Sequence, residues 1–324
     1  FGLAKTIVDK FKLGSNDLVI DVGSNVGVLL DGFKKQGCRT IGIEPSGNIA
    51  EKALERGIQT INEFISPGLA TRVVADNGLA SVVCITNVFA HIHDLDGFME
   101  AVNALLNADG VLVIEAPHFL QLINHLEYDT IYHEHLLYVS VRPLNHLFKR
   151  FGFEVFDVDE MPIHGGTVRI YVSRTGRNKS TNAVAQIISN EEQGGAFDLE
   201  RLTRFSDEVM AHRQKLVNLL RTLKREGRTL AGVSAPAKGM TLLNFCEIGT
   251  DLLDFITEKS KLKIGRYTPG AHIPVLPDPE LLSRRPDYVL LLAWNFADEI
   301  IANLSEYREA GGKFIIPIPE PKII

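Results

Sequence analysis

Two histidines and a glutamate stand between two tyrosines in the segment IYHEHLLYVS, residues 131–140. Such a mixture could form a metal site, an acid–base site or a polar stretch of core. A histidine has an unperturbed pKa of about 6.5, so an imidazole can take up a proton at neutral pH. If the segment is helical, Tyr132 and His135 share a face. If it is extended, Tyr132 lies on the same face as Glu134, opposite His133 and His135.

The spacing of these histidines disfavours zinc. The H-E-x-x-H motif places its two ligands four residues apart on a helix, whereas His133 and His135 are two apart. A second pair, His91 and His93, could bind a metal from a strand, but nothing fixes a third ligand. We therefore expect no metal and favour acid–base chemistry.

The histidines are concentrated in one part of the chain. Eight of the ten fall between positions 91 and 164: His91, His93, His118, His125, His133, His135, His146 and His164. For His93, His125 and His146 an ordinary core or surface role is the simplest expectation. The others follow predicted strands, where α/β proteins bind ligands.

A glycine-rich loop follows the first predicted strand, in IDVGSNVGVLL. A dinucleotide loop needs G-x-G-x-x-G, but here Asn25 replaces the middle glycine and Gly27 comes one residue early, so NAD is disfavoured. A glycine turn after an acid, here Asp21, is typical of S-adenosylmethionine enzymes. Gly23 and Gly27 would let the backbone pass close to the cofactor.

Further polar residues end the neighbouring strands. Glu44 lies 17 residues past Gly27 and could accept hydrogen bonds from both ribose hydroxyls. Asn87 and His91 follow the fourth strand at the same rim. We assign these residues to cofactor binding with Asp21, Gly23, Asn25 and Gly27, in a pattern that looks like a class I methyltransferase.

The elements that must hold this first site alternate between strand and helix. The predicted strands are 17–23, 39–46, 58–65, 80–89 and 110–119, and the predicted helices are 26–37, 46–57, 66–76 and 95–110. The strands are continuous apolar runs, which indicates a parallel sheet covered on both faces. A helix over 143–152 follows, and then strands over 153–162 and 166–174. Their short connection predicts an antiparallel hairpin at one edge.

The rest of the chain repeats the alternation. Residues 183–226 predict helices broken near Gly194–Gly195, and then come strands over 229–235, 252–260, 286–294 and 313–319 with helices over 239–249 and 297–311. We expect a methyltransferase domain at 1–178, a helical linker at 179–227 and a smaller Rossmann-like domain at 228–324. The predicted fold class is α/β.

Composition excludes several classes of protein. The chain of 324 residues has 34 Lys and Arg against 40 Asp and Glu, a net charge of −6, with no basic face for nucleic acid. No apolar run reaches membrane-spanning length. The three cysteines, Cys38, Cys84 and Cys246, are far apart and suggest neither disulfides nor zinc. We expect a cytoplasmic protein that binds a small molecule.

Several motifs in order resemble the C-methyltransferases that act on nucleotide-linked (dTDP-type) deoxysugars. They are VIDVGSNVG, IGIEPS, TNVFAHIHDL, YDTIYHEHLLYVS, HGGTVRIYV and YTPGAHIPV, and they cover nearly the whole chain. YHEH and HGGTVR are the specific parts, because many methyltransferases share the glycine loop.

The resemblance implies a mechanism. A keto-sugar on a nucleotide diphosphate loses the proton beside its carbonyl, and the enolate attacks the methyl group of S-adenosylmethionine. Matching the motif makes His135 the general base, with Tyr132 and Glu134 orienting it or stabilising the enolate. His164 and Gly165 would shape the sugar pocket.

In the second domain, residues 235–239 could present backbone N–H groups to a phosphate, with Lys238 beside them. The segment RYTPGAHIPV, with Tyr267 and His272, resembles a family segment that faces the active site. A purely structural second domain is the alternative. Members of this family usually begin with a cysteine-rich zinc domain. It is lacking here, and we expect either a fragment that begins at Phe1 or a branch without the domain.

Two other functions stay open from the residues alone. An O- or N-methyltransferase could use the same pocket, since many O-methylations also need a base. An NAD-dependent oxidoreductase built from two Rossmann-like domains is less favoured because of the glycine loop.

Overall fold

The computed structural model describes residues 2–324, apart from the side chain of His164, and the chain forms two compact units. The first unit contains the described residues up to Phe119, then Leu136–Pro162 and Gly166–Gly194. The second unit contains Leu120–His135, Ile163–Gly165 and Gly195–Ile324. The units therefore interleave along the chain, whereas the predicted ranges divide it at 178 and 228. The YHEH segment belongs to the second unit.

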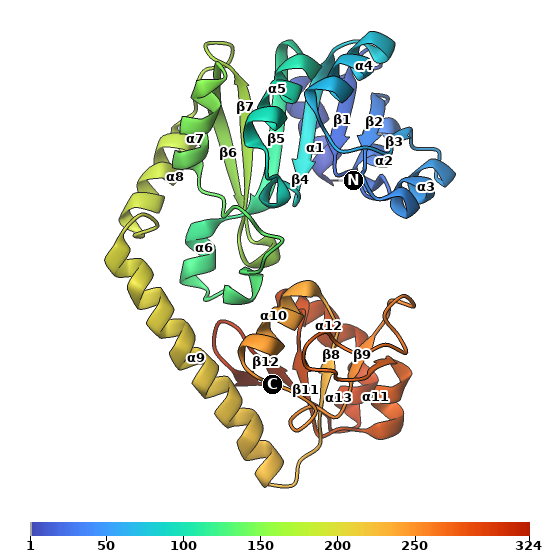
Figure 1. Ribbon diagram of the computed structural model, residues 1–324, viewed down its shortest axis with the longest axis vertical. Helices are drawn as coiled ribbons and strands as arrows, with labels where there is room; N and C mark the ends of the chain where they lie inside the picture. Colours follow the sequence, from blue (N-terminus) through green and yellow to red (C-terminus); the bar gives the residue numbers. More distant parts are fainter. Residues whose placement is uncertain (1) are drawn as a thin grey trace. The chain divides into compact units, whose positions relative to one another are not determined.

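The first unit is built on a seven-stranded sheet of order β3-β2-β1-β4-β5-β7-β6 (Figure 1). Its strands are β1 (Leu18–Val22), β2 (Arg39–Ile43), β3 (Thr60–Ile61), β4 (Ala80–Thr86), β5 (Leu106–Pro117), β6 (Phe153–Met161) and β7 (Thr167–Arg174). β1 to β5 run parallel, while β7 pairs antiparallel with both β5 and β6. The predicted parallel sheet with an antiparallel hairpin at its edge is confirmed.

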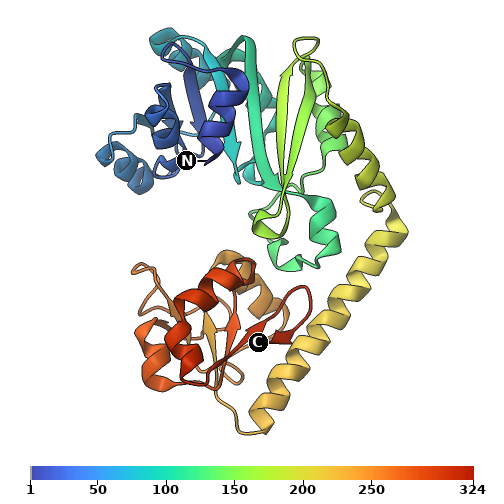
Figure 2. The ribbon, with the colours of Figure 1, turned by 180° about the vertical axis from the view of Figure 1, so that it is seen from behind.

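Helices cover both faces of this sheet because its strands are apolar on both sides. Alternate residues of β1 point to opposite faces, so Val19 and Ile20 belong to different core clusters. One face packs against α1 (Gly2–Phe11) and α2 (Val28–Lys35), and Figure 2 shows α1 lying across it. The other face packs against α4 (Pro67–Asn77), α5 (Leu95–Leu105), α7 (Val141–Arg150) and α8 (Asn182–Gln193).

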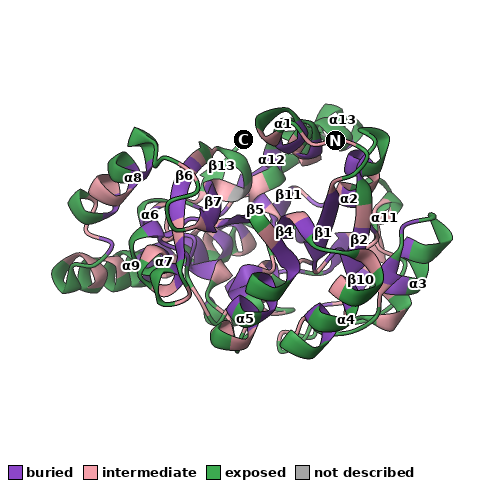
Figure 3. Ribbon diagram, turned by 90° about the horizontal axis from the view of Figure 1, so that it is seen from above, coloured by how far each residue is buried: buried purple, intermediate pink, exposed green. Residues whose placement is uncertain are grey.

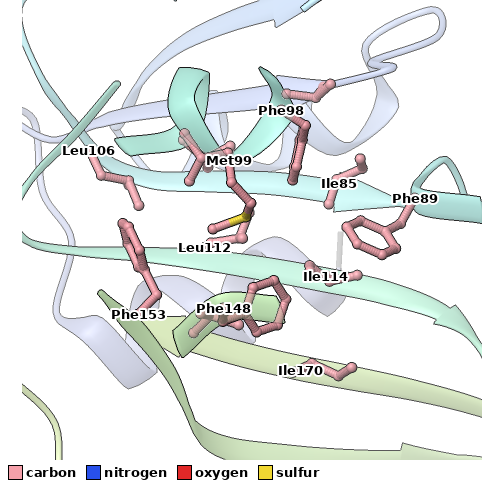
Figure 4. Packing of buried hydrophobic residues seen from close by; sticks show 14 of the residues in the cluster. Ile85, Phe89, Phe98, Met99, Leu106, Leu112, Ile114, Phe148, Phe153 and Ile170 are labelled. Atoms are coloured by element: carbon pink, nitrogen blue, oxygen red, sulfur yellow. The ribbon is translucent and has the colours of Figure 1, made fainter. Parts of the chain in front are cut away.

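Aromatic and aliphatic side chains fill the space between this second face and its helices. Figure 4 shows Phe98 and Met99 of α5 above Leu112 and Ile114 of β5. The central strands are buried along their length (Figure 3), which gives the loops at their ends a rigid base. α3 (Gly47–Glu55) lies beyond β2 and adds Ala53 to a small separate cluster.

The second unit is built on a six-stranded sheet of order β10-β9-β8-β11-β12-β13. Its strands are β8 (Leu230–Val233), β9 (Ile256–Glu258), β10 (Val275–Pro277), β11 (Tyr288–Leu291), β12 (Lys313–Ile316) and β13 (Lys322–Ile323), all parallel except β13. α9 (Leu199–Arg225) and α10 (Ala237–Phe245) pack on one face. α11 (Pro279–Arg284), α12 (Ala297–Asn303) and α13 (Ser305–Glu309) pack on the other.

Some predicted elements differ from the structure. The predicted strands at 58–65 and 252–260 are paired only at Thr60–Ile61 and Ile256–Glu258. The predicted single helix at 297–311 is wrong, because the backbone departs from helical geometry at Leu304 (φ −109°) and divides α12 from α13. The break in the linker helices at residues 194–198 is confirmed. The sequence did not predict α1, α11, β10, β13 or α6 (Phe119–Asn124).

Candidate functional site

The glycine loop after β1 requires glycine at two positions. Gly23 and Gly27 have φ of 71° and 74°, in the left-handed region. A Cβ added to Gly23 would lie 2.5 Å from Val88, and one added to Gly27 would lie 2.8 Å from Ile58. The loop therefore combines an unusual backbone with close packing, which holds its amide groups in fixed places before α2.

Glu44 closes this loop from the end of β2. Its Oε2 accepts a hydrogen bond from the Asn25 amide at 3.0 Å, and its Oε1 accepts one from the Ser46 amide at 2.9 Å. The side chain is 8% exposed. A carboxylate held by two backbone amides keeps free lone pairs in a fixed direction, as an acceptor for ribose hydroxyls needs.

Asp21 is the acid that precedes the loop, and it is buried on β1. Burial, and then the neighbouring charge of Glu44, raise the pKa of Asp21 from 3.8 to about 8. Its Oδ1 has no hydrogen-bond partner among the described residues. A buried carboxylate in this state lacks a counter-charge or a donor, and a cationic ligand would supply one.

Asn87 and His91 lie beyond the end of β4, as predicted. Asn87 has a φ of 56°, and its amide donates to the carbonyl of Glu115 on β5 at 2.7 Å. His91 ends the 3₁₀ helix η1 (Phe89–His91), and both side chains are exposed. β1 and β4 are neighbours at the point where the strand order reverses, so these residues and the glycine loop border the ligand crevice of the first sheet.

The YHEH segment forms a turn, which settles the question between helix and extended chain. The His135 amide donates to the carbonyl of Tyr132 at 2.9 Å. Tyr132 Oη lies 3.1 Å from His135 Nε2, and the two ring centroids are 4.3 Å apart. His133 and Glu134, at the tip of the turn, are exposed. The turn therefore brings the side chains of Tyr132 and His135 together and leaves His133 exposed.

The hydrogen bonds of His135 define its tautomer. Nδ1 lies 2.8 Å from the carbonyl oxygen of Thr130, which can only accept, so Nδ1 carries the hydrogen. The lone pair is then on Nε2, which accepts from the Tyr132 hydroxyl. The imidazole is oriented at one nitrogen and basic at the other, which is the arrangement that a general base requires.

A buried carboxylate lies close to the predicted sugar-pocket residues. Gly165 has a φ of 89°, and an added Cβ would collide with the carboxylate of Glu127. His125 Nδ1 lies 2.7 Å from the carbonyl oxygen of Gly165 and 3.6 Å from Glu127 Oε1. Burial is the main reason that the pKa of Glu127 rises to about 7. The side chain of His164 lies outside the described part of the chain.

Lys238 has carboxylate neighbours rather than an open anion site. Its Nζ lies 4.0 Å from the centroid of the Trp294 ring, and Trp294 Nε1 donates to Asp129 Oδ2 at 2.7 Å. Burial lowers the pKa of Lys238, and the charges of Asp129 and Glu127 oppose that change. A phosphate beside Lys238 would have to share this region with two acids.

The second sheet reproduces the carboxylate arrangement of the first. Glu258 ends β9, and its two oxygens accept from the amides of Ala235 at 2.9 Å and Ser260 at 3.1 Å. Because the Ala235 amide is engaged in this way, it is not free for the phosphate contact expected of residues 235–239. A cavity of about 260 Å³ lies at the strand ends, lined by Glu258, Ser234, Asp278 and other residues.

Tyr267 and His272 lie on one loop of the second unit. Tyr267 is 68% exposed and pairs with Pro274 in an isolated bridge, while the His272 amide donates to the carbonyl of Thr268 at 3.0 Å. The structure thus groups the predicted cofactor residues in the first unit. The predicted catalytic and substrate residues fall in the second.

Comparisons with known proteins match two successive parts of the chain, which do not coincide with the two interleaved units. The family profile described as "Methyltransferase domain" matches residues 3–158, and the one described as "C-methyltransferase C-terminal domain" matches residues 162–319. The C-methyltransferase NovU from Streptomyces niveus is 36% identical over 323 residues, which cover 99% of this chain and 77% of that enzyme. The chain belongs to the C-methyltransferase family. It is an S-adenosylmethionine-dependent enzyme.

Solved methyltransferases resemble part of this C-methyltransferase. The magnesium protoporphyrin IX methyltransferase (ChlM) from Synechocystis PCC 6803 with bound SAH is 15% identical, with a TM-score of 0.42 over 54% of this chain and 80% of that one. An S-adenosylmethionine-dependent methyltransferase from Aquifex aeolicus is 14% identical, with a TM-score of 0.40 over 52% of this chain and 88% of that one.

The residues of the first unit fit S-adenosylmethionine. The cofactor carries positive charge and ribose hydroxyls. The unpartnered oxygen of Asp21 offers a counter-charge to the positive charge, and Glu44 offers a hydrogen-bond acceptor to the ribose hydroxyls. When it is bound, the cofactor supplies an electrophilic methyl group. Among the described side chains, which do not include that of His164, no group of three or more His, Cys, Asp or Glu is placed to hold a metal ion. No helix within residues 2–324 is long and apolar enough to cross a membrane.

Several residues of the candidate site were not predicted from the sequence. Glu127 and Asp129 stand in EYDT, which only Ile131 separates from YHEH, and their nearness to it was an available signal. Glu258 ends the second strand of its domain, as Glu44 does, so a comparison of the two domains could have found it. Trp294 had no such signal, because its partner lies 165 residues away.

Proposed function

We propose that this C-methyltransferase acts on a nucleotide-linked keto-deoxysugar, and that methylation proceeds through an enolate. The observation that carries the proposal is the turn from Tyr132 to His135, in which an oriented imidazole has its lone pair on Nε2. Transfer of a methyl group to carbon needs a carbon nucleophile, and a carbon beside a carbonyl becomes one when a base removes its proton.

In the proposed reaction, His135 Nε2 takes the proton from the carbon beside the sugar carbonyl. The electron pair of that C–H bond moves into the enolate, whose negative charge rests mainly on oxygen. Tyr132, which donates to Nε2 in the free enzyme, would turn its hydroxyl to the enolate oxygen. The new C–C bond would use the enolate electron pair, the methyl–sulfur bond would break with its pair going to sulfur, and S-adenosylhomocysteine would be the leaving group. The imidazolium then returns its proton to water.

Two observations support an acceptor that carries a nucleotide. The motifs YHEH and HGGTVR resemble those of enzymes that act on such sugars. In addition, Glu258 repeats the amide bonds of Glu44 at a cavity lined from four strand ends, and a nucleotide would bring ribose hydroxyls to such a carboxylate.

The test measures proton abstraction by itself. With a dTDP-linked keto-deoxysugar in heavy water and S-adenosylhomocysteine present, NMR follows loss of the signal of the proton beside the carbonyl. We expect His135→Ala to lower this exchange rate by a factor of about 10²–10⁴, the usual contribution of a general base. His133→Ala is the matched control, because it changes an exposed histidine of the same turn.

Unchanged exchange in His135→Ala would refute the assignment of the base. Cofactor binding by both variants, followed by calorimetry, shows that the first unit remains intact. The product then defines the reaction class. A new methyl signal coupled to carbon supports C-methylation of the sugar, whereas a methyl group on oxygen or nitrogen overturns the proposal.

A further inference from the structure

The carbonyl that orients His135 belongs to a short 3₁₀ helix, η2 (Tyr128–Thr130). Such a helix has too few hydrogen bonds of its own to be rigid. Within it, Thr130 donates from its hydroxyl to the carbonyl of Glu127 at 2.7 Å. The other two residues, Tyr128 and Asp129, are buried, and their side chains bond to residues far along the chain.

Asp129 ties η2 to the 3₁₀ helix η4 (Trp294–Phe296). Its side chain is fully buried, and its Oδ2 accepts from Trp294 Nε1 at 2.7 Å. Lys238, with its Nζ 4.0 Å from the centre of the Trp294 ring, places a positive charge beside the pair. Burial raises the pKa of Asp129, while the charge of Lys238 and the hydrogen bond from Trp294 oppose that rise. Both neighbours therefore favour the charged carboxylate, whose hydrogen bonds are stronger than those between neutral groups.

Tyr128 ties η2 to α9 from another direction. Its hydroxyl lies 3.0 Å from His212 Nδ1, and His212 Nε2 lies 2.7 Å from the carbonyl oxygen of Pro317. Because that carbonyl can only accept, Nε2 carries the hydrogen and Nδ1 accepts from Tyr128. Burial lowers the pKa of His212, which keeps the ring in this neutral form.

We propose that Trp294 and His212 are positioning residues for the general base. They fix Asp129 and Tyr128, η2 is thereby held on both sides, and the Thr130 carbonyl keeps His135 in one orientation. This inference rests on the proposed function, since it takes His135 as the base. It gives the second unit a part in catalysis besides any contact with the acceptor.

Small displacements of a base are costly. Catalytic groups must be held within about 0.5 Å of the productive geometry, and an error of about 1 Å can reduce the rate by a factor of about 10². The hydrogen bonds of Thr130 with other described residues are local, to Glu127 and His135, so a movement of η2 would also move the imidazole.

The test replaces Trp294 with Phe, which keeps an aromatic ring but removes the N–H group. We expect exchange of the proton beside the sugar carbonyl to fall about 10–100-fold at saturating acceptor. KM for the acceptor should change less than about threefold, and affinity for S-adenosylhomocysteine should stay the same. Tyr128→Phe, which removes the hydrogen bond to His212, should likewise lower the exchange rate at saturating acceptor and leave KM for the acceptor nearly unchanged.

Tyr307→Phe is the matched control. Tyr307 is also buried in the second unit, and its hydroxyl donates to the carbonyl of Pro286 at 2.8 Å, in a different core cluster from Tyr128. We expect this variant to lose thermal stability to a similar extent and to keep wild-type exchange. If exchange falls in all three variants in proportion to their melting temperatures, the role is only structural and the inference is refuted.

The two proposals can fail separately. If His135→Ala exchanges like the wild type, the assignment of the base is wrong. If His135→Ala loses exchange while folded Trp294→Phe keeps it, the base is correct and the positioning inference is overturned.

Discussion

Asp21 should make the cofactor-free enzyme less stable as the pH rises. Its pKa is raised from 3.8 to about 8, so the folded chain holds the proton more tightly than the unfolded chain does. Between these two values, each pH unit costs about 1.4 kcal/mol of stability, because unfolding then releases a proton. At pH 7 the accumulated loss is about 4 kcal/mol, and above pH 8 it no longer grows.

Asp21→Asn removes this dependence on pH while keeping the shape of the side chain. The carboxamide of the new Asn would be buried where Asp21 Oδ1 has no hydrogen-bond partner, which costs about 1–3 kcal/mol. The net gain at pH 7 is therefore about 1–3 kcal/mol. For a unit of this size that corresponds to an increase in melting temperature of about 2–12 °C. The same change removes the counter-charge for S-adenosylmethionine, so cofactor binding should weaken at least tenfold.

The assay is thermal unfolding from pH 5 to pH 9 with the cofactor removed, together with calorimetry of cofactor binding. Asp76→Asn is the control, because it removes the same charge from an exposed position on α4 of the first unit. The reasoning fails if Asp21→Asn melts at or below the wild type at every pH and shows the same slope. It also fails if the Asp76 control reproduces the gain.

Two further changes test the loop that Asp21 precedes. Glu44→Gln should weaken the binding of S-adenosylhomocysteine about 10–100-fold in calorimetry. The reason is that a carboxamide cannot accept hydrogen bonds from the Asn25 and Ser46 amides and from a ribose diol together. Unchanged affinity would show that Glu44 is not part of the cofactor site. Gly27→Ala should lower stability by about 1–3 kcal/mol in denaturant unfolding, because φ is 74° and the new Cβ would lie 2.8 Å from Ile58; a variant as stable as the wild type would contradict this account of the loop.

The first unit was largely predictable because its signals are local. A buried apolar run, a glycine turn and an acid after the next strand lie within about thirty residues, and each constrains its own short segment. Glu44 bonds to Asn25 because β1 and β2 are neighbouring parallel strands whose ends share one rim. The paired hairpin of β6 and β7 was predictable for the same reason, since its connection is short.

The turn from Tyr132 to His135 could be located in the sequence, but its conformation could not be derived from it. Tyr132 and His135 were identified by type, yet helix and extended chain remained equal alternatives, because the contacts that decide between them involve the Thr130 carbonyl. The anchors of η2 were beyond reach. Trp294 and Asp129 are 165 residues apart, and no periodicity or spacing records such a pairing.

The interleaving of the two units bears on how the chain is made and how it can be recombined. Ribosomes add about 5–20 residues each second, so Asp129 emerges roughly 8–33 s before the Trp294 that will cover it. During that time the segment Leu120–His135 has no finished surface to pack against and exposes groups that end up buried. A hybrid enzyme joined between α8 and α9 would therefore pair Leu120–His135 of one parent with Trp294 and His212 of the other. The hydrogen bonds of Asp129 and Tyr128 come from a single parent only when that segment is transferred together with the later half of the chain.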